Sequence, residues 1–279
     1  MGGGRILSIA CAMLALVACA AIAGLDEPAS DESVDAASDI QLPPRPDVAD
    51  EIPEAAAPDT RAADLGCSAS APSKLIAYWR IDEGNGTDVR NCTSSTLHGT
   101  AKGSFAWVPG RIGPHALGFD GGSVDFGNHP SFSLVGAMTV SAWVRVASYG
   151  TAGRIVSKGG GPTDRGWELN IEQNGIASFK IAPDSTTHIE AATTQPLEPN
   201  TWTHVAGVYE SGVALRLYVN GALVATNADA GTSHRDTNLP VLVGNRPGDR
   251  CCPWIGEIDD VRLFGRALSA EDVAVLAAP

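Results

Sequence analysis

Three carboxylates lie close together near the end of the chain, in the stretch GEIDDVRLFGRALSAEDV. Glu257, Asp259 and Asp260 are of a type that can act as a general acid and a nucleophile, or that can bind a hard cation such as Ca²⁺. A third interpretation is ionic, in which Asp259 or Asp260 pairs with an arginine. The candidate partners are Arg80, Arg262 and Arg266.

The apolar residues around these carboxylates indicate a local irregularity. Ile258 and Val261 both have the character of core residues, yet an odd number of steps separates them. In a regular strand they would face opposite sides of the sheet. A β-bulge at Asp259–Asp260 would bring both to the same side and would redirect a carboxylate.

A second set of residues with binding chemistry lies in two loop-rich stretches, GGGPTDRGWELN (159–170) and GNRPGDRCCPW (244–254). Aromatic rings stack on sugar rings, and arginines donate hydrogen bonds to hydroxyl groups. Loops that carry such residues are often recognition surfaces. The sequence therefore predicts ligand contacts by Arg165, Trp167, Arg246 and Trp254.

Four cysteines follow the N-terminal region, namely Cys67, Cys92, Cys251 and Cys252. An even number in an exported domain favours two disulfides, for which three connectivities exist. The spacing lacks the paired Cys-x₂-Cys elements of a structural zinc site.

Short β-strands must position all these residues. Runs such as MTVSAWVRV (138–146), WELNIE (167–172) and VALRLYVNG (213–221) alternate apolar and polar residues, and Gly, Asn, Asp and Pro separate them. Asn220-Gly221 between two apolar runs predicts a hairpin. Ser269 and Asp272 predict a capping box for one short C-terminal helix. The predicted fold is an all-β, two-sheet antiparallel sandwich.

The N-terminal part of the chain has a different character. Residues 1–23 have one Arg and a long apolar run, as in a secretory signal peptide, and Leu16–Cys19 (LVAC) predicts a bacterial lipobox with Cys19 lipidated. Cleavage after Ala23 and an uncleaved anchor are the alternatives. The protein is expected outside the cytoplasm in every case.

Residues 24–66 predict an acidic, Pro- and Ala-rich disordered linker, and residues 67–279 a single domain. The linker holds twelve acidic and two basic residues, a net charge of −10, whereas the whole chain has a net charge of −13. Because the acidity belongs mainly to the linker and no basic patch is evident, nucleic acid is not an expected partner.

Several stretches resemble the laminin-G-like, concanavalin A-like jelly-roll family of lectins and glucanases. They are LIAYWRIDEGNGTDVRNCTSSTLHGTAKG, WVPGRIGPHALGFDGGSVDFGNHPSFSL, AMTVSAWVRV, NTWTHVAGVYESGVALRLYVNGALVAT and GEIDDVRLFGRALSAEDVAVL. They follow the order of the family and cover about residues 74–276. The resemblance implies a jelly-roll sandwich whose first strand lies beside its last. It also implies a sugar- or protein-binding module and, in some relatives, a structural Ca²⁺.

The resemblance bears on the carboxylates in two ways. Glucanases of this fold carry a Glu-x-Asp-x-Glu motif, or one with an extra residue, but Val261 and Arg262 stand where the second Glu should follow Glu257. We therefore expect no catalytic site there. Ca²⁺ stays open beside pairing with arginine, and its expected ligands are Asp82, Asp120, Asp259 and Asp260.

Adjacent first and last strands would also bring Cys92 close to Cys251 and Cys252. The prediction is that Cys92 bridges one of them and Cys67 the other. The alternative joins Cys251 to Cys252 and Cys67 to Cys92.

Together these observations predict a surface binding module for a carbohydrate or a surface protein, with contact to the membrane only through the lipid on Cys19. A glycoside hydrolase or lyase of the same fold and a structural envelope protein are the alternatives.

Overall fold

The computed structural model describes residues 73–278. The predicted signal peptide, the lipidation site Cys19, the acidic linker and Cys67 lie outside these residues and stay predictions. None of the helices within residues 73–278 is long and apolar enough to cross a membrane.

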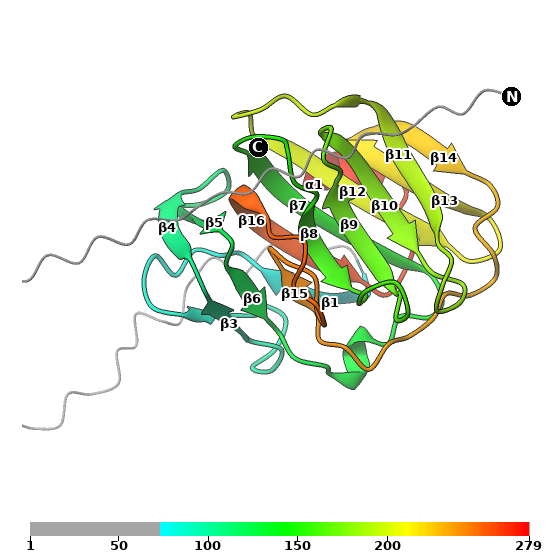
Figure 1. The fold of residues 1–279 in the computed structure, drawn as a ribbon, viewed down its shortest axis with the longest axis horizontal. Helices are drawn as coiled ribbons and strands as arrows, with labels where there is room; N and C mark the ends of the chain where they lie inside the picture. Colours follow the sequence, from blue (N-terminus) through cyan, green and yellow to red (C-terminus); the bar gives the residue numbers. More distant parts are fainter. Residues whose placement is uncertain (1–72, 279) are drawn as a thin grey trace, which may run out of the picture. The chain divides into compact units, whose positions relative to one another are not determined.

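The described chain forms two antiparallel sheets that pack face to face, which confirms the predicted jelly-roll sandwich (Figure 1). The first sheet has the strand order β14-β13-β12-β7-β16-β5-β4, with β1 also paired to β16, and the second has the order β11-β10-β9-β8-β15-β6-β3-β2. The strands are β1 (Leu75–Trp79), β2 (Asp88–Val89), β3 (Gly99–Lys102), β4 (Phe105–Pro109), β5 (His115–Asp120), β6 (Ser123–Asp125), β7 (Met138–Val146), β8 (Gly153–Lys158), β9 (Trp167–Ile171), β10 (Ile176–Ile181), β11 (Ile189–Pro196), β12 (Thr203–Glu210), β13 (Ala214–Val219), β14 (Ala222–Asn227), β15 (Leu242–Val243) and β16 (Ile255–Phe264). One 3₁₀ turn, η2 (Pro130–Phe132), and one helix, α1 (Ala270–Leu276), complete the described part.

The hydrophobic core lies between the two sheets, because alternate residues of each strand point inward. In β9, Trp167, Leu169 and Ile171 are buried in this core, and Phe179 of β10 joins them. Burial of such apolar and aromatic surface supplies the main stabilisation of a sandwich of this kind. The alternate side chains of the same strands point outward, and they are the residues available for a site on the face of the second sheet.

The long strand β16 joins the first strand to the rest of the sheet, as the family resemblance implied. Its two halves have different neighbours on one edge, since Ile255–Ile258 pair with β5 and Val261–Phe264 pair with β1. The pairing with β7 on the other edge shifts between Asp259 and Arg262, and Asp260 has a φ of 49°. The predicted bulge is therefore confirmed, and Ile258 and Val261 are both fully buried.

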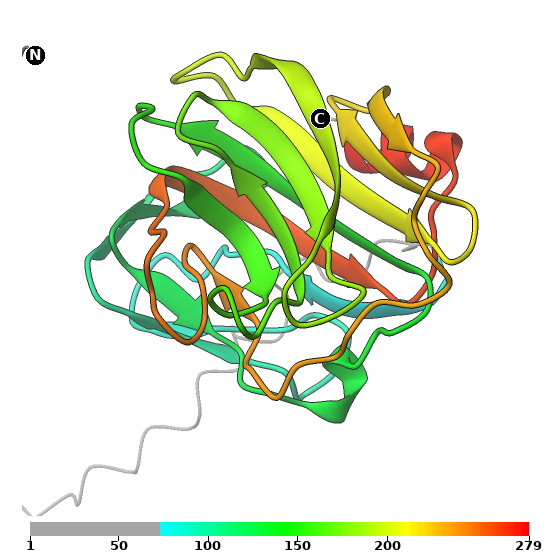
Figure 2. The same cartoon turned by 45° about the vertical axis from the view of Figure 1, so that its right-hand side comes forward.

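Two local predictions are also confirmed. Asn220 and Gly221, with φ of 48° and 80°, form the turn between β13 and β14. Ser269 and Asp272 form the capping box of α1. The buried residues of α1, Val273 and Leu276, pack against Tyr218 and Phe264 in a second apolar cluster on the outward side of the first sheet, so the helix lies away from β8–β11 (Figure 2).

The preferred disulfide connectivity was wrong, because Cys251 is joined to Cys252. The prediction assumed that β1 ends beside the beginning of β16. In the structure Trp79, the last residue of β1, pairs with Val261, well beyond the beginning of β16 at Ile255. Cys92 is therefore held near Tyr78, whose carbonyl accepts the Cys92 N–H at 2.8 Å. Cys92 is disulfide-bonded as well.

Candidate functional site

The bulge carboxylates tie three segments of the first sheet together. Asp259 Oδ2 accepts backbone N–H groups of Arg111 and Ile112, at 2.7 and 2.9 Å, in the loop between β4 and β5. Asp260 accepts the hydroxyl of Tyr78 on β1 at 2.8 Å and pairs with Arg262 at 2.8 Å. The arginine pairing that the sequence suggested is present between Asp260 and Arg262.

Burial dominates the electrostatics of Asp259. The pKa of its carboxyl is raised to about 7 from an ordinary value of 3.8, mainly by loss of hydration, and the negative charges of Asp260 and Asp82 contribute in the same direction. The two backbone N–H groups that Asp259 accepts act in the opposite direction. The carboxylates are thus close enough to influence one another.

The other predicted calcium ligands are engaged differently or lie elsewhere. Asp82 pairs with Arg80 at 2.8 Å and accepts the N–H of His115 at 3.2 Å. Asp120 is exposed and lies opposite Ile255, at the other end of the β5–β16 pairing from the bulge. No group of three or more His, Cys, Asp or Glu within residues 73–278 could hold a metal ion. Asp82, Asp259 and Asp260 already accept from N–H groups, a hydroxyl or arginines, which favours a structural role over Ca²⁺ binding.

Two of the predicted ligand contacts are wrong. Trp167 and Trp254 are both 1% exposed and belong to the core between the sheets. Side chains alternate along β9, so Trp167 points inward with Leu169 and Ile171, while Glu168 and Asn170 point outward. Trp254 packs against Gly153, where the absence of a side chain leaves room for the indole ring.

The two arginines of that prediction are brought together. Arg165 and Arg246 come from different loops and line one pocket on the outward side of β8–β11. We call it the basic pocket, and its lining residues are Arg154, Arg165, Gly166, Glu168, Lys180, His188 and Arg246.

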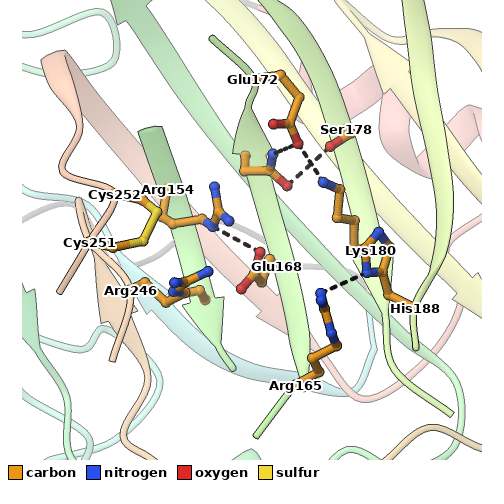
Figure 3. Close-up of polar contacts among 12 residues, drawn as sticks. Arg154, Arg165, Glu168, Glu172, Ser178, Lys180, His188, Arg246, Cys251 and Cys252 are labelled. Carbon is orange, nitrogen blue, oxygen red and sulfur yellow. Dashed lines mark hydrogen bonds and ion pairs between the residues drawn. A yellow bond between two sulfur atoms is a disulfide. The ribbon is translucent and has the colours of Figure 1, made fainter. Parts of the chain in front are cut away.

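Beside the pocket, the outward side of β8, β9 and β10 carries polar side chains that hardly reach solvent (Figure 3). We call this set the polar face, and it consists of Arg154, Glu168, Asn170, Ser178 and Lys180. Their exposed fractions are 6% for Arg154, 9% for Glu168 and zero for Asn170 and Ser178.

The strand register explains the order of the polar face. Arg154 of β8 lies opposite Asn170 of β9, and Asn170 lies opposite Ser178 of β10. Ser178 donates to Asn170 Oδ1 at 3.1 Å, while Asn170 Nδ2 donates to Glu172 Oε1 at 2.8 Å. Glu172 also pairs with Lys180. These cross-strand contacts fix the side chains in one arrangement.

The acidic residues of this region differ in their pKa values. Burial raises the pKa of Glu168, although Arg154 at 2.8 Å acts against this. The pKa of Glu172 is lowered; its burial acts in the raising direction, but hydrogen bonds and charge from Lys180 and the amide of Asn170 outweigh it. Glu172 is therefore the more strongly ionised carboxylate of the two.

His188 is the titratable group of the basic pocket that has no charge near neutral pH. Burial, Lys180 and Arg165 lower its pKa below the ordinary 6.5. Its Nδ1 lies 2.9 Å from Arg165 Nη1 and, since the guanidinium can only donate, accepts that hydrogen bond.

The polar face was missed in the sequence, although part of its signal was there. WELNIE places Glu168, Asn170 and Glu172 at alternate positions, which is the Glu-x-Asp-x-Glu spacing with Asn in the central place. In the sequence, this spacing was compared with the glucanase motif only at Glu257. That Arg154, Ser178 and Lys180 lie beside these residues depends on strand pairing and is not visible in the sequence.

The Cys251–Cys252 disulfide lies beside Arg154 and Arg246 at one edge of the polar face (Figure 3). The carbonyl of Cys252 accepts the N–H of Arg154 at 3.1 Å. In the same loop, Asp249 accepts Arg246 Nε at 3.0 Å and the N–H of Cys251 at 3.3 Å. The loop thereby holds Arg246 toward the pocket.

Solved structures with a similar fold include binding domains. The binding domain of Paraclostridial Mosquitocidal Protein 1 matches with a TM-score of 0.60 at 17% identity, over 73% of this chain and 52% of that one. Domain 4 of AbnA, an extracellular arabinanase of Geobacillus stearothermophilus, was solved in complex with arabinotriose. It matches with a TM-score of 0.57 at 21% identity, over 74% of this chain and 98% of that domain.

A curated human protein is similar over a shorter stretch. Adhesion G-protein coupled receptor D1 of Homo sapiens is 31% identical over 77 residues, which are 26% of this chain and 9% of the receptor. The chain therefore spans less than a tenth of that receptor and about half of the toxin structure. The model of the concanavalin A-like lectin/glucanases superfamily matches residues 119–274, more than half of the chain. The chain belongs to the concanavalin A-like lectin/glucanase superfamily.

Proposed function

We propose that this protein is a non-catalytic binding module that recognises a carbohydrate through the polar face and the basic pocket of β8–β11. Cys19, lipidated at the LVAC motif, tethers the module to the membrane outside the cytoplasm, and the acidic linker holds it away from the lipid surface. A surface protein is the alternative partner.

The observation that carries this proposal is the ordered, almost buried polar network on the outward side of a sheet. Outward side chains that serve only solubility do not need fixed partners. Here the buried Asn170 and Ser178 hold Glu172, which pairs with Lys180, so the partly exposed Glu172 and Lys180 are oriented before a ligand arrives. Such preorganisation reduces the entropy lost on binding a flexible saccharide. Membership of a lectin-containing superfamily supports the same conclusion.

A glycan array probed with the purified protein tests this function. We expect binding to at least one glycan class and loss of that binding in Asn170→Ala, which breaks the contacts to Ser178 and Glu172. Asn174→Ala, in the exposed turn after β9, is the matched control and should bind like the wild type. If the protein is folded and binds no glycan on the array, the result would contradict a carbohydrate function and favour a protein partner.

A hydrolase is the second candidate, because Glu168 and Glu172 have pKa values displaced in opposite directions on one strand. Such displacement is typical of an acid and nucleophile pair. Against it, Asn170 stands in the central place, Arg154 pairs with Glu168, and Lys180 pairs with Glu172. Release of reducing ends from a bound polysaccharide, abolished in both Glu168→Gln and Glu172→Gln, would establish the hydrolase instead.

A further inference from the structure

The basic pocket has an unusual charge composition for this domain. Its lining includes four cationic side chains, Arg154, Arg165, Lys180 and Arg246, and a single carboxylate, Glu168. Residues 67–279 as a whole contain twenty acidic and sixteen basic residues, a net charge of −4. The side chains that line the pocket are therefore net positive, whereas the domain as a whole is acidic.

Three of these four cations have a carboxylate partner, and Arg165 has none among residues 73–278. Lys180 pairs with Glu172 and Glu190, and Arg246 pairs with Asp249. Arg154 pairs with Glu168, the one carboxylate of the lining. Arg165 instead donates to the uncharged ring of His188.

Two guanidinium groups keep donors that are not used within the described part of the chain. Arg154 is 94% buried, since 6% of its surface is exposed, and its Nη1 has no acceptor among residues 73–278. Arg165 Nε has none there either. A buried donor without an acceptor is costly, so an acceptor supplied by a ligand would gain an unusually strong, charge-assisted interaction.

We propose that the basic pocket binds an oxyanion of an acidic saccharide, either the carboxylate of a uronic acid or a sulfate ester, with Arg154 and Arg165 as its donors. The inference rests on the proposed carbohydrate function and specifies the class of sugar. The oxyanion accepts from Arg154 Nη1 and Arg165 Nε. Asn170 and Ser178, which have no exposed surface, hold the partly exposed Glu172 and Lys180 in place, and these two hydrogen-bond hydroxyl groups of the adjoining sugar residues.

Isothermal titration calorimetry with three oligosaccharide probes of equal length tests the proposal. The salt concentration is about 150 mM, as at physiological ionic strength. The probes are a galacturonic acid oligomer, a sulfated oligomer and a neutral arabinose oligomer. We expect one of the two charged probes to bind at least about tenfold more tightly than the neutral probe, as charge-assisted hydrogen bonds allow. The charged probe that binds identifies carboxylate or sulfate as the source.

Arg165→Gln is the decisive variant, because Arg165 lies at the partly exposed margin and its replacement should not disturb the fold. It should weaken the charged probe by about tenfold or more and leave the neutral probe unchanged. Arg154→Gln should do the same, with its melting temperature measured beside that of the wild type. Lys102→Gln is the control, because it removes an exposed cation of β3 that pairs with Asp125 and does not line the basic pocket.

The possible outcomes distinguish the acidic-sugar inference from the proposed carbohydrate function. Equal or tighter binding of the neutral probe, unaffected by Arg165→Gln, would overturn the acidic-sugar inference and leave the carbohydrate function intact. Failure of all three probes and of the glycan array would overturn both.

Discussion

Asp259 offers a quantitative test of the physical reasoning, through the replacement Asp259→Asn. The carboxyl is fully buried at the bulge of β16 and accepts two backbone N–H groups through Oδ2. An asparagine oxygen can accept the same two N–H groups, so the loop between β4 and β5 keeps its anchor. The replacement removes the buried charge and its titration.

The expected magnitude follows from the pKa of Asp259. Burial raises it to about 7 in the folded protein, whereas 3.8 is the ordinary value that applies to the unfolded chain. Between these pH values the folded state holds a proton that the unfolded state has lost, so stability falls as the pH rises. A difference of about 3 between the two pKa values corresponds to about 4 kcal/mol. This loss develops from about pH 4 and is complete above about pH 7.

Urea denaturation of the wild type and of Asp259→Asn, measured from pH 4 to pH 8, provides the assay. The free energy of unfolding of the wild type should fall by about 4 kcal/mol relative to that of the variant across this range. Other buried carboxyls with raised pKa values, such as Glu168, are common to both proteins and cancel in the difference. Asp229→Asn, at an exposed position, should run parallel to the wild type. Parallel profiles for Asp259→Asn would refute the assignment of a buried, titrating carboxyl.

Three further results are expected. Adding Ca²⁺ or a chelator should shift the melting temperature by less than about 1 °C, because Asp82, Asp259 and Asp260 already accept from N–H groups and arginines; a saturable shift of several degrees, measured by differential scanning fluorimetry, would instead support the calcium site. Ser269→Ala should lower the free energy of unfolding by about 1 kcal/mol through loss of the capping box, and an unchanged urea midpoint would argue against the role of α1 in packing. The double replacement of Cys251 and Cys252 by Ser should cost only about 1 kcal/mol, since the loop that it opens is the shortest possible, yet it should weaken saccharide binding through Arg246 several-fold; unchanged affinity would show that the disulfide does not organise the site.

Much of the fold could be predicted because its signals are local. Alternation gives the strands, Asn220-Gly221 gives the hairpin, and Ser269 with Asp272 gives the start of the helix. The odd step between Ile258 and Val261 even located the bulge, because both residues must be buried. Each of these signals spans a few residues and needs no knowledge of strand pairing.

The errors arose where the answer depended on contacts between distant segments. The disulfide prediction needed to know which half of β16 pairs with β1, and hence where Cys92 would lie. Trp254 lies in the loop before β16, as expected, but it is buried because Gly153 leaves space for its ring. The wrong prediction for Trp167 could have been avoided, because the alternation in WELNIE already places Trp167 on the opposite side of the strand from Glu168.

The candidate site could be predicted only in part for the same reason. Arg165 and Arg246 were identified from their loops, and the structure brings them into one pocket. Arg154, Asn170 and Ser178 escaped notice because polar residues at alternate strand positions usually face solvent. Only the register of β8, β9 and β10 places them side by side.

A crystal structure of the protein with its tightest saccharide tests directly whether the outward face of β8–β11 binds the ligand. We expect an oxyanion within hydrogen-bond distance of Arg154 Nη1 and Arg165 Nε, with sugar hydroxyls on the partly exposed Lys180 or Glu172. A saccharide bound to the first sheet or to loops distant from this face, with the basic pocket free, would contradict it.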